Sequence, residues 1–120
     1  RSSIDPGIVA DIGYRDILPG EIARDGSPLR PNIVWFGEAV PAMEEAAEIA
    51  AYAEIFAVIG SSLAVYPAAG LINYVAMMTP VFLVDPKPVR VPSMHEVEYI
   101  QEGAVKGVSI LTEKLRELKI

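Results

Sequence analysis

Residues 55–70, IFAVIGSSLAVYPAAG, constrain the fold more than any other stretch of the sequence. A run of apolar and small residues leads into Gly60, two serines follow, and a helix-compatible run opens near Tyr66. Continuous apolar runs of this length are typical of parallel strands that are buried on both faces. The stretch therefore predicts a buried parallel strand that passes through a tight turn into a helix.

The turn at Gly60 is also the first candidate binding site. In open α/β sheets, ligands bind in the crevice at the carboxyl ends of the strands. Gly60 permits a close approach of the backbone to a ligand, and the hydroxyls of Ser61 and Ser62 can bond a sugar or a phosphate. A capped turn without any ligand explains these residues about as well, so both interpretations stay open for this stretch alone.

Strands and helices alternate through the rest of the carboxyl-terminal part. We expect short strands over 32–36, 81–84 and 97–100, and helices over about 41–53, 66–78 and from 104 to the end. The last helix has an apolar face made of Val108, Leu111, Leu115 and Leu118. The alternation predicts an α/β fold, a partial Rossmann-like parallel sheet with helices on both faces in three layers, joined by right-handed crossovers.

Residues 1–31 differ from this pattern, because proline and glycine interrupt them too often for a long helix or strand. We expect an irregular segment here, followed by one domain over 32–120. A chain of 120 residues is too short for two domains of ordinary size. The apolar fraction of 52% is high for a free-standing soluble domain, so we expect another part of the protein or a second copy to cover some apolar surface.

Charge and composition exclude several classes of function. The formal net charge is −6 and the 10 basic residues are scattered, which argues against binding to nucleic acid. There is no cysteine and one histidine, His95, so thiolate sites and multi-histidine metal sites are not expected. We interpret His95, in the proline-rich loop 86–96, as a surface residue and not as a general base. No apolar run is long enough for a membrane span and no signal peptide is visible, so we expect a cytoplasmic protein.

Asp85 is the second candidate ligand residue, because it directly follows the apolar run 81–84. In nucleotide-binding folds an acidic residue at this place reaches a ribose hydroxyl, about 20 residues after the glycine turn. The interval from Gly60 is slightly longer here. The competing interpretation is that Asp85 and Pro86 only begin a turn.

Two blocks of the sequence are specific enough to compare with known families. They read LRPNIVWFGEAVP at residues 29–41 and GSSLAVYPAAGL at residues 60–71. Both blocks, at their separation, resemble the patterns RP-x-VVWFGE and G-T-S-L-x-V-x-P-A of bacterial sirtuins, the NAD-dependent protein lysine deacylases. The resemblance covers about residues 29–118 and implies the carboxyl-terminal half of such an enzyme.

The resemblance also implies which residues hold NAD and substrate. The residues implied for NAD are Gly60, Ser61, Ser62, Asp85, Pro86, Lys87 and Ala104. An acyl-lysine peptide or protein would lie as an added strand against Val34, Phe36, Gly37, Glu38, Val65 and Tyr66. Val34 and Phe36 would line the apolar tunnel for the lysine. Most members have asparagine where this chain has Asp85, whose carboxylate can still accept hydrogen bonds from ribose hydroxyls.

Several features of the family are absent from this sequence. Sirtuins have a Gly-Ala-Gly phosphate loop and a histidine base upstream of the first block, and neither occurs here, so no catalytic residue is assigned. Their four zinc cysteines would fall within residues 1–28, so we expect residues 1–31 to stand in place of the zinc module without binding zinc. The parent enzyme would transfer an acyl group from lysine to the ADP-ribose of NAD and release nicotinamide, while the isolated chain would be inactive.

The expected partners follow from a sheet that is cut in half. We expect the missing amino-terminal half of the same protein to complete it, and the isolated chain to form homo-oligomers, because a strand edge and apolar helix faces are exposed. Two other interpretations stay open. One is a short non-catalytic module that binds a nucleotide or acts as a scaffold. The other is a different NAD or nucleotide enzyme whose turn converged on the same residues.

Overall fold

The computed structural model describes residues 1–91 and 94–118. The chain divides into two compact units, Arg1–Ala39 and Val40–Ile120, and each is described by itself. The domain division expected between residues 31 and 32 stays a prediction. Within the first unit, an ion pair between Arg30 and Glu38 (2.6 Å) links the residues on either side of that point.

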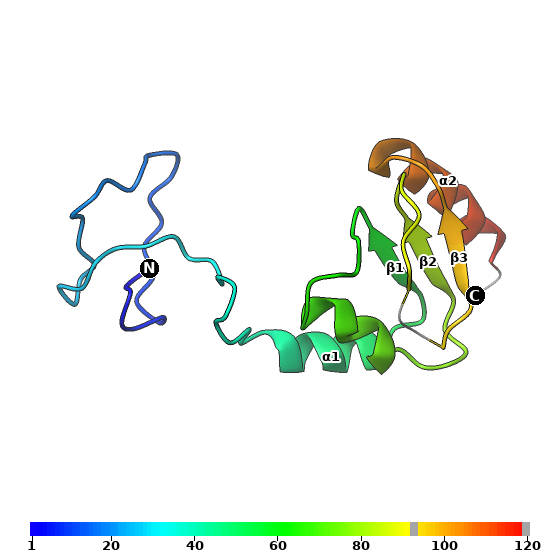
Figure 1. The fold of residues 1–120 in the computed structure, drawn as a ribbon, viewed down its shortest axis with the longest axis horizontal. Helices are drawn as coiled ribbons and strands as arrows, with labels where there is room; N and C mark the ends of the chain where they lie inside the picture. Colours follow the sequence, from blue (N-terminus) through cyan, green and yellow to red (C-terminus); the bar gives the residue numbers. More distant parts are fainter. Residues whose placement is uncertain (92–93, 119–120) are drawn as a thin grey trace. The chain divides into compact units, whose positions relative to one another are not determined.

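A parallel sheet of three strands forms the centre of the second unit (Figure 1). In chain order the elements are α1 (Met43–Ala51), β1 (Phe56–Ile59), the 3-10 helix η1 (Ala68–Tyr74), β2 (Val81–Val84), β3 (Val97–Ile100) and α2 (Ala104–Glu117). The strands lie in the order β1-β2-β3, so β2 is the central one. Both pairs are parallel, which confirms the predicted sheet.

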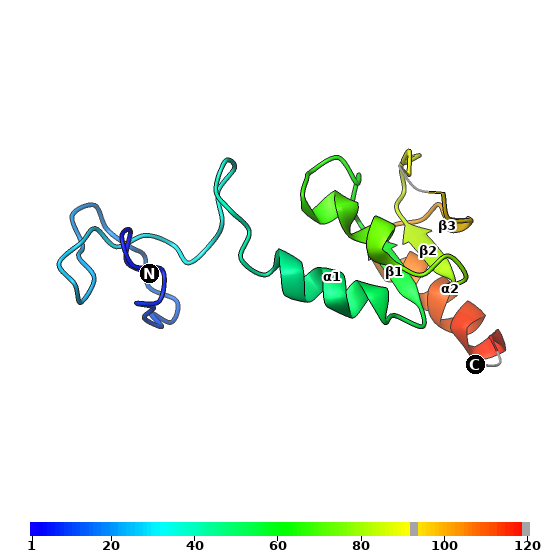
Figure 2. The ribbon, with the colours of Figure 1, turned by 90° about the horizontal axis from the view of Figure 1, so that it is seen from below.

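Helices cover both faces of this sheet (Figure 2). On one face, Ala50 of α1 and Ile72 of η1 form a buried cluster with Val81 of β2. On the other face, Leu111 of α2 packs in a cluster with Phe82. Successive strand residues point to opposite faces, so a strand buried on both faces needs apolar residues at every position. β2 has four buried residues in a row, and the three-layer prediction is confirmed.

Two of the predicted helices differ from those observed. The helix expected over 66–78 is the shorter η1, since Gly70 lowers helix propensity inside the run and Val75 already has extended backbone (ψ 138°). The last helix ends at Glu117, and its predicted face is only partly buried, with Val108 38% and Leu118 37% exposed. Residues 119 and 120 of that prediction lie outside the described residues, as do 92 and 93 of the loop expected over 86–96.

The first unit is irregular, as expected, with two isolated antiparallel bridges that join Ser2 to Leu29 and Ile22 to Pro28. The strand predicted over 32–36 was wrong. A strand needs a neighbour that accepts its N–H groups. In the described chain none pairs with this segment, and the Trp35 N–H donates instead to the carboxylate of Glu38 at 3.0 Å.

A buried polar cluster joins the beginning of the first unit to its later part. The hydroxyl of Ser2, which is 1% exposed, donates to Asp25 at 2.6 Å and lies 2.7 Å from the hydroxyl of Ser27. Hydrogen bonds from Ser2 and Ser27 lower the pKa of the Asp25 carboxyl. Because this pKa is lower in the folded state than in the unfolded state, the stabilisation from Asp25 is present above its unfolded pKa and is lost as the pH falls.

Two further findings concern membranes and metals. None of the helices within residues 1–91 and 94–118 combines the length and apolarity needed to cross a membrane. In the same residues, no group of three or more His, Asp or Glu side chains could hold a metal ion. The expectation that zinc does not bind stays a prediction.

Candidate functional site

The carboxyl ends of the three strands lie side by side at one edge of the sheet. Ile59, Val84 and Ile100, the last residues of β1, β2 and β3, are register partners. The ladder continues one residue further, since the Gly60 N–H donates to the Val84 carbonyl at 2.8 Å and the Asp85 N–H donates to the Ile100 carbonyl at 3.3 Å. The turns that begin at Gly60 and Asp85 are therefore neighbours.

The turn after β1 is fixed by its backbone and by one buried side chain. Gly60 has φ +65°, and no atom lies within 4 Å of the point that a β-carbon would occupy there, so its φ and not a lack of space demands glycine. The Ser61 hydroxyl accepts the Leu63 N–H at 3.2 Å. Leu63 also has positive φ (52°), and its side chain is buried in a cluster with Leu83. Ser61 and Ser62 stay exposed at the sheet edge.

The turn after β2 is built on Asp85. Its carboxylate accepts the Lys87 N–H at 2.8 Å, so the Asp-Pro turn expected as the competing interpretation is present. A carboxylate offers about four acceptor positions, and this bond uses one of them. The phenol of Tyr99 on β3 donates to the Lys87 carbonyl and braces the turn. Asp85 is half-buried, while Pro86 and Lys87 are exposed.

The third segment at this edge is the beginning of α2. Ala104 is the first residue of the helix and is exposed, and Gly103 before it has extended backbone (ψ 153°). The Glu102 N–H donates to the Ile100 carbonyl at 2.9 Å, which turns the chain from β3 into the helix. All residues predicted to contact NAD thus follow the carboxyl ends of three adjacent strands. That they bind NAD stays a prediction.

His95 lies near the opposite edge of the sheet. It precedes Val97, which pairs with Val81 at the amino end of the strands. Its Nε2 lies 3.0 Å from the Val75 carbonyl, and the residue is half-buried, so it is less exposed than expected. This position leaves His95 away from Gly60 and Asp85. That it has no catalytic role stays a prediction.

The residues predicted to bind substrate are divided between the two units. Val65 and Tyr66, in the second unit, are 54% and 61% exposed. In the first unit Val34 and Phe36 are 42% and 91% exposed, and Gly37 has φ +87°. No described contact tests their role toward a substrate, which stays a prediction.

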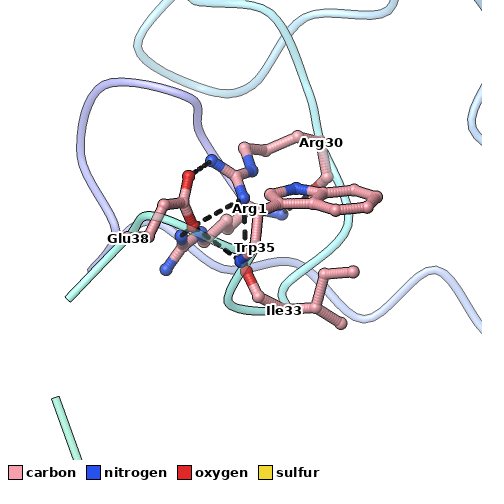
Figure 3. A network of polar contacts seen from close by, with 5 residues as sticks. All are labelled: Arg1, Arg30, Ile33, Trp35 and Glu38. Carbon is pink, nitrogen blue, oxygen red and sulfur yellow. Dashed lines mark hydrogen bonds and ion pairs between the residues drawn. The ribbon is translucent and has the colours of Figure 1, made fainter. Parts of the chain in front are cut away.

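Glu38 is the exception among these residues, because its carboxylate is already engaged within the first unit (Figure 3). It accepts bonds from both terminal nitrogens of Arg30, at 2.6 and 3.1 Å, and from the Trp35 N–H. Arg1 lies 3.7 Å away. These groups, the Arg30 hydrogen bonds first, lower the pKa of Glu38 to about 2.

Sequence reasoning missed three residues that hold these segments in place. Arg30 lay inside the first sequence block but received no role, although its charge opposite Glu38 was a usable signal. Leu63 looked like a further apolar residue, and its positive φ has no marker in the sequence. Gly107 lies in the first turn of α2, where glycine is a weaker helix former than alanine, and its presence there could have indicated close packing.

Comparison with known proteins adds independent findings. The model of the Sir2 family matches residues 12–67. An NAD-dependent protein deacylase of Bacteroides thetaiotaomicron is 47% identical over 105 residues, which are 88% of this chain and 43% of that protein. An NAD-dependent protein deacylase of Helicobacter pylori strain 26695 is 40% identical over 121 residues, covering 98% of this chain and 51% of that protein. The chain spans about half the length of the curated relatives it matches.

Solved structures agree with this comparison. One described as "Structural Basis for the Mechanism and Regulation of Sir2 Enzymes" has a TM-score of 0.65 at 31% identity and covers 80% of this chain and 40% of that chain. Another, "Structure of Sir2Tm bound to a propionylated peptide", has a TM-score of 0.62 at 32% identity over 74% of this chain and 38% of that chain.

The parallel sheet, the helices on both of its faces and the turns along one edge define a partial Rossmann-like α/β protein. The family, sequence and structure matches make the assignment of this chain more specific. This chain is a partial sirtuin region of the Sir2 family, as the two sequence blocks indicated.

Proposed function

We propose that the protein containing this chain is an NAD-dependent protein lysine deacylase, and that the chain supplies part of its NAD pocket and one wall of its peptide cleft. The observation that carries the proposal is the adjacency of the Gly60 and Asp85 turns, linked by the bond from the Gly60 N–H to the Val84 carbonyl (2.8 Å). Relatives named as NAD-dependent protein deacylases support it.

The residues at this edge fit a dinucleotide. Open space around Gly60 leaves room for a ligand next to the backbone. The exposed hydroxyl of Ser62 can donate to a phosphate or sugar oxygen, and the Asp85 carboxylate can accept from ribose hydroxyls while repelling a 2′-phosphate. NAD would supply the ADP-ribose to which the acyl group is transferred as nicotinamide leaves. This chain's own contribution is to bind and orient.

We propose that the 120-residue chain does not turn over substrate by itself. Its sequence has one histidine, and that residue lies near the amino end of the strands, away from the Gly60 turn. A general base must lie within hydrogen-bond reach of the proton it removes. The alternative function is that of a non-catalytic nucleotide-binding or scaffolding module. NAD binding without any turnover of an acyl-lysine peptide by the full-length gene product would favour this alternative.

Replacing Asp85 or Ser62 by alanine is expected to weaken NAD binding to the full-length product of the gene. Bonds to a charged group contribute about 1.5–3 kcal/mol and neutral ones about 0.5–1.5 kcal/mol, so we expect losses of about 10- to 100-fold for Asp85→Ala and about 3- to 10-fold for Ser62→Ala. Isothermal titration calorimetry with NAD measures both.

Asp11→Ala is the matched control for Asp85→Ala, since Asp11 accepts the Gly13 N–H at the same 2.8 Å in a comparable turn. Its affinity for NAD is expected to equal that of the unmodified protein. Unchanged NAD affinity in both Asp85→Ala and Ser62→Ala would remove the pocket assignment and favour convergence of the turn on the same residues.

We also propose that the amino-terminal half of the full-length protein, which precedes this chain, covers an apolar groove of the second unit. In its absence, the 120-residue chain would self-associate through this groove. The groove, about 340 Å³, runs between α1 and the edge strand β1 and is lined by residues such as Ala46, Ile49 and Phe56. Ile49 is 66% exposed. Light scattering of the chain is expected to give a dimer or larger species, reduced by Ile49→Lys. A strictly monomeric chain would contradict this.

A cytoplasmic location is part of the proposal, as is acyl-lysine in a peptide or protein as the substrate. The substrate class is supported by a neighbouring structure described as bound to a propionylated peptide. Fractionation of the source cells, with detection of the protein in the soluble or the membrane fraction, tests the location.

A further inference from the structure

The turn formed by residues 30–38 is closed by one carboxylate. The Glu38 carboxylate accepts hydrogen bonds from both terminal nitrogens of Arg30, at 2.6 and 3.1 Å, at the beginning of the turn. It also accepts a hydrogen bond from the Trp35 N–H, at 3.0 Å, in the middle of the turn. The Glu38 N–H in turn donates to the Trp35 carbonyl at 3.1 Å. Arg30 also donates to the Ile33 carbonyl at 3.3 Å. Figure 3 shows Arg30, Arg1 and the Trp35 N–H around the Glu38 carboxylate.

The backbone of this turn is held while its apolar side chains remain outside. Val34 is 42%, Trp35 53% and Phe36 91% exposed, and none of the three belongs to a buried cluster. Apolar side chains in the described part of the turn therefore do little to fix its shape. The polar contacts of Arg30 and Glu38 hold the shape of the turn instead, because a bidentate guanidinium–carboxylate pair fixes the relative orientation of the two side chains.

We propose that Arg30 and Glu38 are positioning residues, whose ion pair presents the backbone of residues 34–36 to the acyl-lysine substrate, and that the Glu38 carboxylate itself does not touch the substrate. The inference rests on the proposed deacylase function and makes it more specific. The carboxylate already accepts bonds from Arg30 and from the Trp35 N–H, so a substrate that approaches residue 38 meets its backbone.

The charge state of the pair supports a constant role across neutral pH. The pKa of Glu38 is lowered to about 2, chiefly by the hydrogen bonds from Arg30. Because this pKa lies below the unfolded value of 4.5, the contribution of the pair is fully present above about pH 4.5 and is lost only as the pH falls toward 2. The effect of the pair on substrate binding is therefore expected to be flat between about pH 6 and 9.

Steady-state kinetics of the full-length gene product test the inference with two variants. Glu38→Gln keeps the shape but removes the charge, and Arg30→Lys keeps the charge but removes the bidentate fork. We expect both variants to raise KM for an acyl-lysine peptide by about tenfold through misplacement of the turn, with kcat changed less than about twofold. The KM for NAD is expected to stay unchanged in both.

The matched control is Glu113→Gln, which removes an exposed ion pair with Arg116 (2.6 Å) on α2 and is expected to change neither KM. Circular dichroism of each variant checks folding, and Arg30→Lys, as the milder change, serves if Glu38→Gln unfolds. An unchanged peptide KM in Arg30→Lys and Glu38→Gln overturns the inference, as does a fall in kcat or an equal rise in the KM for NAD, and the deacylase proposal then still stands. No deacylation by the unmodified protein overturns both.

Discussion

Replacing Gly107 by alanine is expected to lower the free energy of unfolding by about 1–2 kcal/mol, although alanine is the better helix former. A side-chain carbon at position 107 would lie 2.2 Å from Cγ1 of Val84, which is completely buried in β2. Overpacking of this kind costs about 1–3 kcal/mol and occasionally more, while the gain in helix propensity is about 1 kcal/mol. Chemical denaturation followed by circular dichroism measures the net loss.

Gly103→Ala makes the same chemical change just before the helix, where no atom lies within 4 Å of the added carbon. We expect a cost below about 1 kcal/mol there, from the weaker cap alone. The double variant Gly107→Ala with Val84→Ala is expected to lose less stability than the sum of the two single variants. The reason is that Val84→Ala removes the Cγ1 methyl that the added carbon at position 107 would clash with. Equal stability of Gly107→Ala and the unmodified chain would show that α2 does not approach β2 as closely as described.

Leu83→Ala is expected to cost about 3 kcal/mol, within the range of about 2–5 kcal/mol for buried leucines. Leu83 has no exposed surface and forms a cluster with Leu63 and Ala69. Leu63 holds a positive φ of 52°, which costs a residue other than glycine about 1–3 kcal/mol and persists only while its side chain is anchored. The substitution should therefore loosen residues 60–66 as well as destabilise the sheet.

Denaturation gives the global loss for Leu83→Ala, and amide hydrogen exchange over residues 60–66 gives the local one. Val105→Ala is the matched control, since Val105 is 90% exposed and its truncation is expected to change stability by less than about 0.5 kcal/mol. Faster exchange throughout the second unit, with no excess at 60–66, would contradict the proposed anchoring of the turn by Leu83.

Most of the second unit could be predicted from the sequence. The buried run 81–84 gave β2 at its observed bounds, because a strand enclosed on both faces carries apolar residues without alternation. The same logic predicted that Gly60 and Asp85 follow neighbouring parallel strands, so their adjacency at one edge followed from the topology. The resemblance to sirtuins, carried by two short blocks, agrees with the family match.

The first unit was harder to predict, because its structure depends on polar contacts between distant residues. The β-branched and aromatic residues at 32–36 favoured a strand, yet β propensity needs a neighbouring strand to be realised. The contact between Glu38 and Trp35 decided the local structure instead. The cluster of Ser2, Asp25 and Ser27 gave no periodic signal, since its members act through hydrogen bonds and not through a repeating apolar pattern.

The central position of β2 in the sheet affects how this protein can fold while it is being translated. Translation delivers α1 and β1 before β2, yet β1 pairs with β2 and α1 shares its buried cluster with Val81. Until residue 84 has left the ribosomal exit tunnel, α1 and β1 of the nascent chain expose apolar residues that β2 will later cover. Exposed apolar segments of this kind are bound by chaperones. Stalled chains that end before and after β2 are expected to differ sharply in chaperone capture, and equal capture would contradict this order of events.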